Sequence, residues 1–167
     1  MQSVEETRLA ARDDLATAVL ADNRAAGRRI AVAESCTGGL VAAAITEIPG
    51  SSAVLDRGFV TYSNEAKHDS LGVADDILDA FGAVSVACVY AMAQGALERS
   101  KADVAVAISG IAGPDGGSPG KPVGTVVFAR AVRGSDKPDA ESRLFEDQDR
   151  AGVRLQATLC ALELLLP

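Results

Sequence analysis

Ser35, Cys36 and Thr37 are residues whose types and spacing could support nucleophilic chemistry, because two hydroxyls and a thiol stand together directly before Gly38 and Gly39. Glycines let a ligand approach the backbone closely, and free N–H groups at a helix start attract an anion or a developing oxyanion. The same pattern also fits a serine that caps a helix and a flexible turn after it. The local sequence leaves both interpretations open.

A serine nucleophile needs a base, and Lys67 and His68 are the candidates in the segment that follows Tyr62. Lys67 is expected in the first turn of a helix, where the helix dipole and partial burial would both lower its pKa. Local sequence alone nevertheless favours an ordinary solvated lysine. A Ser-His-Asp triad would have to use His68, the only histidine. We expect His68 to be exposed on a short polar helix instead.

A second glycine-rich loop, residues 109–120, follows the apolar run Val104 to Ile108. It has neither the P-loop pattern nor the Gly-x-Gly-x-x-Gly dinucleotide fingerprint. The stretch from Ser118 to Lys121 matches Ser-x-x-Lys, but Pro119 and Gly120 forbid the helical turn which that motif requires. This loop is therefore a candidate for substrate binding rather than for a known nucleotide signature.

The elements that must position these residues alternate between strands and helices, which indicates an α/β fold. The apolar run Ile30 to Ala33 predicts a buried strand, and Leu40 to Ile48 predicts the helix after it. A strand that turns into a helix places its turn residues at the carboxyl edge of a sheet, where open α/β folds have their sites. The other expected strands cover 53–62, 104–108, 123–132 and 142–145, and the other expected helices run to about 26 and cover 75–81, 85–99 and 150–166.

The composition bounds the class of protein. A length of 167 residues suits one domain, and the low aromatic content of 4% favours a compact α/β protein with small core residues. The net charge of −7 argues against non-specific binding to nucleic acid or to an anionic membrane. Three separated cysteines and one histidine offer no cluster of ligands, so we expect no metal and no cofactor.

The two ends of the chain suggest its location and its assembly. The polar start, residues 1–14, has no apolar segment of a signal peptide, so we expect a cytoplasmic protein with no membrane association. Residues 1–8 are candidates for disorder in an otherwise single domain of residues 1–167. The last expected helix carries two apolar stripes, Val153, Ala157, Cys160 and Leu164 and then Leu155, Leu159, Leu162 and Leu166. A helix apolar on two faces is sandwiched in the core or half of an interface, so we expect a homo-oligomer.

Four segments together resemble the CinA C-terminal domain family, whose catalytic members are nicotinamide-mononucleotide deamidases. The resemblance runs from about residue 8 to the end of the chain. The family usually has Gly-Asp-Arg before its last helix, whereas this chain has Gln148, Asp149 and Arg150. It also lacks the molybdopterin-binding-like domain of full-length CinA proteins, and so resembles the stand-alone form. The four segments are 33–39, 58–67, 82–85 and 109–117 with 121–125.

The resemblance implies an α/β/α three-layer sandwich with a mixed, mostly parallel sheet. It implies hydrolysis of the carboxamide of nicotinamide mononucleotide to nicotinate mononucleotide and ammonia, with Ser35 as the nucleophile and Lys67 as its base. We expect the phosphate to be held by backbone N–H groups of a glycine-rich turn, aided by Arg150 or Arg154, because a planar guanidinium matches phosphate geometry. Each arginine could equally form a surface ion pair. The full set of expected oxyanion and substrate-binding residues is Cys36, Thr37, Gly38, Gly39, Tyr62, Asn64, Ser109, Gly110, Ile111, Gly113, Arg150 and Arg154.

Two alternatives remain open. The domain could be a non-catalytic nucleotide-binding or interaction module, since many proteins of this type are named for competence or DNA damage. It could also be an amidase of the same mechanism that acts on another carboxamide. Intact Ser35 and Lys67 favour an enzyme over the first alternative.

Overall fold

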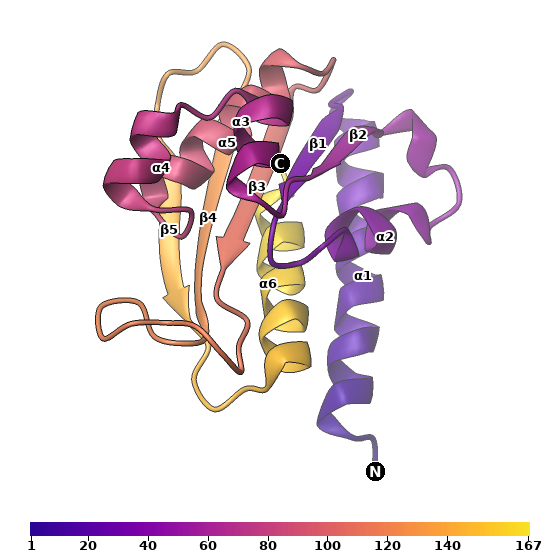
Figure 1. Cartoon of the computed structure of the whole chain (residues 1–167). Helices are drawn as coiled ribbons and strands as arrows, with labels where there is room; N and C mark the ends of the chain where they lie inside the picture. The colour runs from indigo at the N-terminus through magenta and orange to yellow at the C-terminus, as the bar shows by residue number, and fades with distance from the viewer.

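The computed structural model describes all residues from Met1 to Pro167 and contains one sheet with helices on both faces (Figure 1). The strands are β1 (Ile30–Glu34), β2 (Leu55–Val60), β3 (Val104–Gly110), β4 (Thr125–Val132) and β5 (Asp139–Leu144). The helices are α1 (Val4–Ala25), α2 (Leu40–Thr46), α3 (Asn64–Leu71), α4 (Asp75–Phe81), α5 (Val86–Glu98) and α6 (Arg150–Leu164), with a short 3-10 turn at Ser51–Ala53.

The five-stranded sheet has the order β2-β1-β3-β4-β5. Strand β1 pairs in parallel with both β2 and β3, whereas β4 pairs antiparallel with β3 and with β5. The expected mixed α/β/α sandwich is therefore confirmed. Four strands run in the same direction, and β4 alone runs in the opposite direction. Because β4 has two neighbours, the sheet contains two antiparallel pairings as well as two parallel ones.

Alternation along the strands divides the core into two layers. In β3 the larger residues Val104, Val106 and Ile108 face α1, α2 and α6, and all three are fully buried. Ala105 and Ala107 face the opposite layer, which α3, α4 and α5 cover (Figure 1). Alanines on that face let α5 lie close to the sheet, which explains how a chain with few aromatics can still fill its core.

Helix α6 is apolar on two faces because two parts of the same chain cover it. One stripe packs on the sheet, and α1 runs beside the other (Figure 1). Leu162 is fully buried, and Leu164 and Leu166 are half-buried against the same core cluster. The two stripes therefore have an intramolecular explanation, and the feature that motivated the expectation of a homo-oligomer does not require a second subunit.

The ends of the elements follow local signals. Helix α1 begins at Val4 with a complete capping box, in which the Ser3 hydroxyl and the Glu6 carboxylate each bond the other residue's N–H, although residues 1–8 were candidates for disorder. The edge strand β5 begins at Asp139, three positions earlier than the expected start at Ser142.

None of the helices combines the length and the apolar character that a membrane-spanning helix requires.

Candidate active site

The candidate site lies where the direction of the chain across the sheet reverses. From β1 the chain passes through α2 to β2 on one side, and it returns through α3, α4 and α5 to β3 on the other side of β1. Ligands in open α/β sheets bind at such a switch point, outside the carboxyl ends of the strands. Ser35 directly follows β1, and Ser109 lies at the end of β3, so the topology brings the two serines to one edge.

Ser35 and Lys67 meet at this edge although they are 32 positions apart. The Nζ atom of Lys67 donates a hydrogen bond to the Oγ atom of Ser35 at a distance of 3.0 Å. It also donates to the Thr61 carbonyl oxygen at 2.8 Å. The backbone of Ser35 is held in turn, because its N–H donates to the Ile108 carbonyl at 2.9 Å. The hydroxyl and the amine are therefore fixed within proton-transfer distance.

Lys67 is almost completely buried, with a relative exposure of 1%. Its position in the first turn of α3 aims the side chain inward, toward the end of β1. Burial disfavours the charged ammonium and lowers the pKa of Lys67 below its usual value of 10.5. The prediction of a solvated lysine, which the local sequence favoured, is wrong, because tertiary packing decides the environment of this side chain.

The turn after Ser35 depends on two glycines in left-handed conformations, Gly38 with φ of 60° and Gly39 with φ of 106°. L side chains rarely adopt these angles, so the glycines permit the sharp entry into α2. The buried Glu34 carboxylate then accepts hydrogen bonds from the N–H groups of Gly39, Val41 and Ala42 at 3.0–3.2 Å. The N–H groups that could have bound an anion at the start of α2 therefore already bind a carboxylate of the protein.

The N–H groups of Cys36 and Thr37 donate to no oxygen atom of the protein, unlike their neighbours, and the Cys36 N–H is near only its own thiol. The N–H of Gly38 donates to the Ser35 carbonyl at 3.0 Å, and that of Gly39 donates to Glu34. Of the four expected residues in this turn, Cys36 to Gly39, only Cys36 and Thr37 thus keep an N–H that is free to stabilise an oxyanion.

The thiol of Cys36 packs in the core. Its side chain joins the cluster of buried residues below the sheet, and burial raises its pKa to about 11. A Cβ atom at Gly110 would lie only 3.1 Å from Cys36 Sγ, so glycine leaves the space that the sulfur occupies. At neutral pH the thiol is protonated, which makes it a poor nucleophile.

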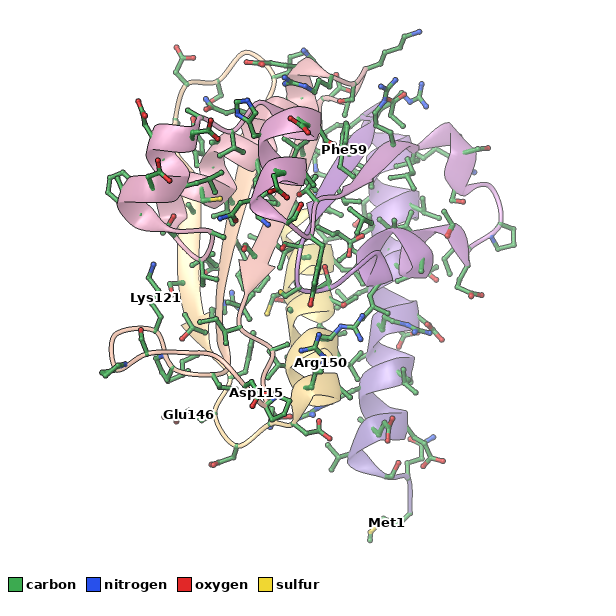
Figure 2. The ribbon with its side chains drawn as sticks, in the orientation of Figure 1. Met1, Phe59, Asp115, Lys121, Glu146 and Arg150 are labelled. Carbon is green, nitrogen blue, oxygen red and sulfur yellow. The ribbon has the colours of Figure 1, made fainter.

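A cavity of about 170 Å³ opens beside the two catalytic candidates. Tyr62 and Arg150 stand at its mouth, where Arg150 donates to the Tyr62 hydroxyl at 3.2 Å and to the Gly113 carbonyl at 2.7 Å. Figure 2 shows Arg150 at the end of the molecule where the loop with Asp115 also lies. The lining consists of Ser35, Cys36, Tyr62, Asn64, Lys67, Ala83, Val84, Ser109, Gly110, Ala112 and Arg150.

Tyr62 is not a core aromatic, because 64% of its surface is exposed. Its ring stands over the cavity and its hydroxyl is oriented by Arg150. The Ser109 residue is 1% exposed, yet it lines the cavity and its hydroxyl has no hydrogen-bond partner in the protein. These polar groups could orient a ligand with few hydrogen bonds.

Arg154 lies behind the turn rather than in the cavity. Its Nε atom donates to the Cys36 carbonyl at 3.1 Å, and one terminal nitrogen donates to the Thr37 carbonyl at 3.2 Å. It also borders a second hollow with Ala112 and Arg150. Neither arginine forms a surface ion pair, and Arg150 is the one that lines the catalytic cavity.

Several expected site residues do not line the cavity. Thr37 is fully buried, and the N–H of Ile111 is used in a hydrogen bond to the Thr125 carbonyl. His68 is exposed on α3, as expected, contacts the Val73 carbonyl and lies over a separate acidic hollow with Asp75. Gly38, Gly39, Gly113 and Arg154 contact the site only through the turn or through Arg150.

Sequence reasoning missed the roles of Glu34 and Thr61. Glu34 ends a buried strand directly before a glycine turn and a helix, and a carboxylate in that place is a signal for helix capping. Thr61 acts through its backbone carbonyl, for which side-chain patterns give no signal. Ala83 and Val84 line the cavity from the segment that precedes α5, one of the four segments that carried the resemblance.

The turn before α6 forms despite the departure from Gly-Asp-Arg. Asp149 caps α6 by accepting the Gly152 N–H at 2.7 Å, and Arg150 begins the helix. The left-handed residue of this turn is Asp147, with φ of 55°, so Gln148 needs no glycine conformation. Gln148 instead accepts a hydrogen bond from Arg8 of α1 at 2.7 Å.

The chain contains no group of three or more His, Cys, Asp or Glu residues that could hold a metal ion.

Comparison with known proteins places these residues in a family. Residues 12–167 match the model of the CinA C-terminal domain. A protein of Enterobacter agglomerans named nicotinamide-nucleotide amidohydrolase PncC is 52% identical over 153 residues, which cover 92% of each chain. A competence-damage inducible protein of Symbiobacterium thermophilum is 56% identical over 146 residues, but the chain spans only 34% of that relative's length.

A solved structure has the same fold. The competence/damage inducible protein CihA from Agrobacterium tumefaciens superposes with a TM-score of 0.90 and is 49% identical, with 93% of each chain covered. At this identity the similarity includes the sequence as well as the arrangement of elements. The geometry of Ser35 and Lys67 can therefore be interpreted within that family.

Proposed function

The chain belongs to the CinA C-terminal domain family, and we propose that it hydrolyses the carboxamide of nicotinamide mononucleotide to nicotinate mononucleotide and ammonia. The observation that carries this proposal is the buried pair of Ser35 and Lys67, with 3.0 Å between Oγ and Nζ, at the wall of a cavity. The high identity to a named nicotinamide-nucleotide amidohydrolase over nearly its whole length supports the choice of substrate.

The first step is attack by Ser35 on the carboxamide carbon. The hydroxyl is a weak nucleophile until a base removes its proton, and Lys67 is the base within reach. Burial lowers the pKa of Lys67, so part of the population has a neutral amine that can accept this proton. The bound pyridinium is cationic and favours the neutral amine further.

The attack forms a bond between Oγ and the carboxamide carbon and places negative charge on the carboxamide oxygen. The N–H of Cys36, next to the nucleophile and without an acceptor in the protein, is the donor best placed to stabilise that charge. Lys67, now protonated, gives its proton to the nitrogen that leaves as ammonia when the C–N bond breaks. Water then attacks the acyl group with Lys67 again as base, and release of the carboxylate restores Ser35.

Arg150 and the polar groups at the cavity mouth bind the nucleotide part of the substrate in this proposal. Arg150 begins α6 and can turn its guanidinium toward a phosphate, for which its planar fork is well suited. Tyr62 and Asn64 line the same side, and Gly110 keeps the floor of the cavity open. No step requires a metal or an organic cofactor.

Release of ammonia from nicotinamide mononucleotide by the purified protein tests this function directly. Nicotinamide and nicotinamide riboside serve as controls, because they lack the sugar phosphate or the phosphate alone. Hydrolysis of the mononucleotide with a kcat/KM well above both controls is the expected result. Turnover of another carboxamide in its place would identify an amidase of different specificity.

Two further expectations belong to this proposal. An enzyme of nucleotide recycling would act in the cytoplasm, and the homo-oligomer remains a prediction that light scattering would test. If the folded protein binds the nucleotide without releasing ammonia, the domain is a non-catalytic binding module instead.

A further inference from the structure

We propose that Arg154 is a positioning residue that keeps the peptide groups after Ser35 oriented for catalysis, and that it does not bind the substrate phosphate. This inference rests on the proposed function only for the identity of Ser35 as the nucleophile. It starts from the two backbone carbonyls, those of Cys36 and Thr37, that the Arg154 guanidinium binds at 3.1 and 3.2 Å.

Within one peptide group, the direction of the C=O bond determines the direction of the N–H bond. In a trans peptide the C=O of one residue and the N–H of the next point in opposite directions. Arg154 draws the Cys36 carbonyl toward α6, and this directs the Thr37 N–H away from α6. Arg154 also binds the Thr37 carbonyl, whose peptide group carries the Gly38 N–H. That N–H donates to the Ser35 carbonyl at 3.0 Å, which directs the N–H of Cys36 to the opposite side.

These constraints leave two adjacent N–H groups directed away from their bound carbonyls and without an acceptor in the protein. Backbone N–H groups directly after a nucleophile are well placed to stabilise the oxyanion that forms on attack. Cys36 lines the cavity beside Ser35, so its N–H is the nearer of the two to the substrate.

The turn would not keep this orientation unaided, because Gly38 and Gly39 follow it. Glycine allows a peptide group to rotate at little cost, and both residues have positive φ. A rotated peptide would present a carbonyl oxygen where negative charge develops and would oppose catalysis. Arg154 lies against this flexible point, since a Cβ atom on Gly38 would lie 3.4 Å from its terminal nitrogen.

Arg154 comes from α6 and lies 118 positions after Cys36 in the chain. Glu34 holds the other side of the same turn through the N–H groups of Gly39, Val41 and Ala42. The turn is thus fixed by a carboxylate on its N–H groups and a guanidinium on its carbonyls. Arg154 therefore faces the turn, whereas Arg150 is the arginine that lines the cavity.

Substitution of Arg154 tests this inference. Arg154→Met keeps the bulk of the side chain and loses its donors, and Arg154→Lys keeps the charge but offers no planar fork. We expect kcat for nicotinamide mononucleotide to fall about 100-fold in Arg154→Met, the size of effect seen when one oxyanion donor is lost, while KM changes less than about threefold. Arg154→Lys should recover only a small part, and added guanidinium should partly restore Arg154→Ala.

Arg133→Met is the matched control. Arg133 also binds backbone carbonyls, those of Ala102, Leu97 and Ser100 at 2.7–3.1 Å, but lies away from the cavity. The Arg133→Met variant should lose about as much stability as Arg154→Met, but its kcat should not fall. Thermal unfolding shows whether each variant is folded. If Arg154→Met does not fold, the kcat of Arg154→Lys provides the test.

A probe without phosphate separates this inference from the proposed function. Acylation of Ser35 by p-nitrophenyl acetate should slow in Arg154→Met by a factor similar to that for kcat, because the oxyanion is the same. An unchanged acylation rate with a raised KM for the mononucleotide would overturn the inference and make Arg154 a phosphate ligand. If the wild type reacts with the probe but releases no ammonia from the mononucleotide, the proposed substrate is wrong while the role of Arg154 is still tested.

Discussion

The backbone carbonyl of Thr61 accepts a 2.8 Å hydrogen bond from the amine of Lys67. The N–H of Thr61 in turn donates to the carbonyl of Glu34, the residue before Ser35, at 2.8 Å. The lysine is therefore anchored to an extension of the β1–β2 pairing, and the sheet edge itself sets the distance between Lys67 and Ser35.

Ser35 and Lys67 should act as a unit. Ser35→Ala and Lys67→Ala should each lower kcat by about 1,000-fold or more, and the double variant should be little worse than either. The reason is that the nucleophile is ineffective without its base and the base has no other proton to take. Steady-state ammonia release gives the rates, and circular dichroism controls for folding. Multiplicative losses in the double variant would show that the residues act independently.

The rate should rise with pH as Lys67 loses its proton. Since the base acts only as the neutral amine, and burial lowers its pKa, the rise in kcat/KM should be centred below 10.5, the usual value for lysine. Lys67→Arg keeps a positive charge that cannot be removed in this range, so it should be inactive at every pH. A pH profile that is flat from 6 to 10 would contradict a lysine base, and activity in Lys67→Arg would contradict it independently.

Lys67 should lower the stability of the fold. Its pKa is lower in the folded protein than in the unfolded chain, so folding releases a proton between the two values and stability rises with pH through that window. Below the folded-state pKa the cost of burying the charge is present in full. Lys67→Met should therefore raise the free energy of unfolding at pH 7 by about 1 kcal/mol, and the gain should shrink as pH approaches 10.5.

Urea titrations at several pH values measure this difference in stability. Lys101→Met is a suitable control, because Lys101 is an exposed residue after α5 whose side chain makes no hydrogen bond or ion pair. It should change stability little at any pH. A Lys67→Met variant that is less stable than the wild type at pH 7 would mean that the two hydrogen bonds of the amine outweigh its desolvation.

Cys36 should not be the nucleophile. Burial raises the pKa of its thiol to about 11, and its sulfur packs beneath Gly110 in the core. Cys36→Ala should keep kcat within about threefold and lose about 1–2 kcal/mol of stability from the small cavity that it creates. Iodoacetamide should not label Cys36 in the folded protein at pH 7.5. A loss of activity equal to that of Ser35→Ala would reverse the assignment.

Arg150 should affect binding more than chemistry. It lines the cavity and has no contact with Ser35 or Lys67, so Arg150→Ala should raise KM for the mononucleotide by about tenfold or more with a smaller change in kcat. The effect should be much weaker for the riboside, which has no phosphate. Tyr62→Phe tests whether the loss arises indirectly, because it removes only the hydroxyl that Arg150 binds. Equal losses for the mononucleotide and the riboside would place Arg150 outside the phosphate site.

The order of elements was predictable from the sequence, whereas Ser35 and Lys67 were paired only by the resemblance to a family. The buried strands β1 and β3 are short continuous apolar runs, and glycine and proline mark the turns around them. Helix α4 lies where its pattern predicts it, at Asp75–Phe81. The glycine turn after β1 follows from the need for left-handed backbone at Gly38 and Gly39. These signals are local, since they depend on hydrogen bonding and side-chain periodicity within a few residues.

The environment of each functional side chain was decided only by the tertiary structure. The sequence around Lys67 is polar and suggests a solvated side chain, but α3 packs against α5 and brings this side chain to Ser35, where it is buried and its pKa is lowered. The two stripes of α6 suggest a second subunit, but α1 covers one of them. Arg154 suggests a phosphate ligand, but the fold places it behind the nucleophile turn. Burial and orientation arise from contacts between distant segments, which no local pattern encodes.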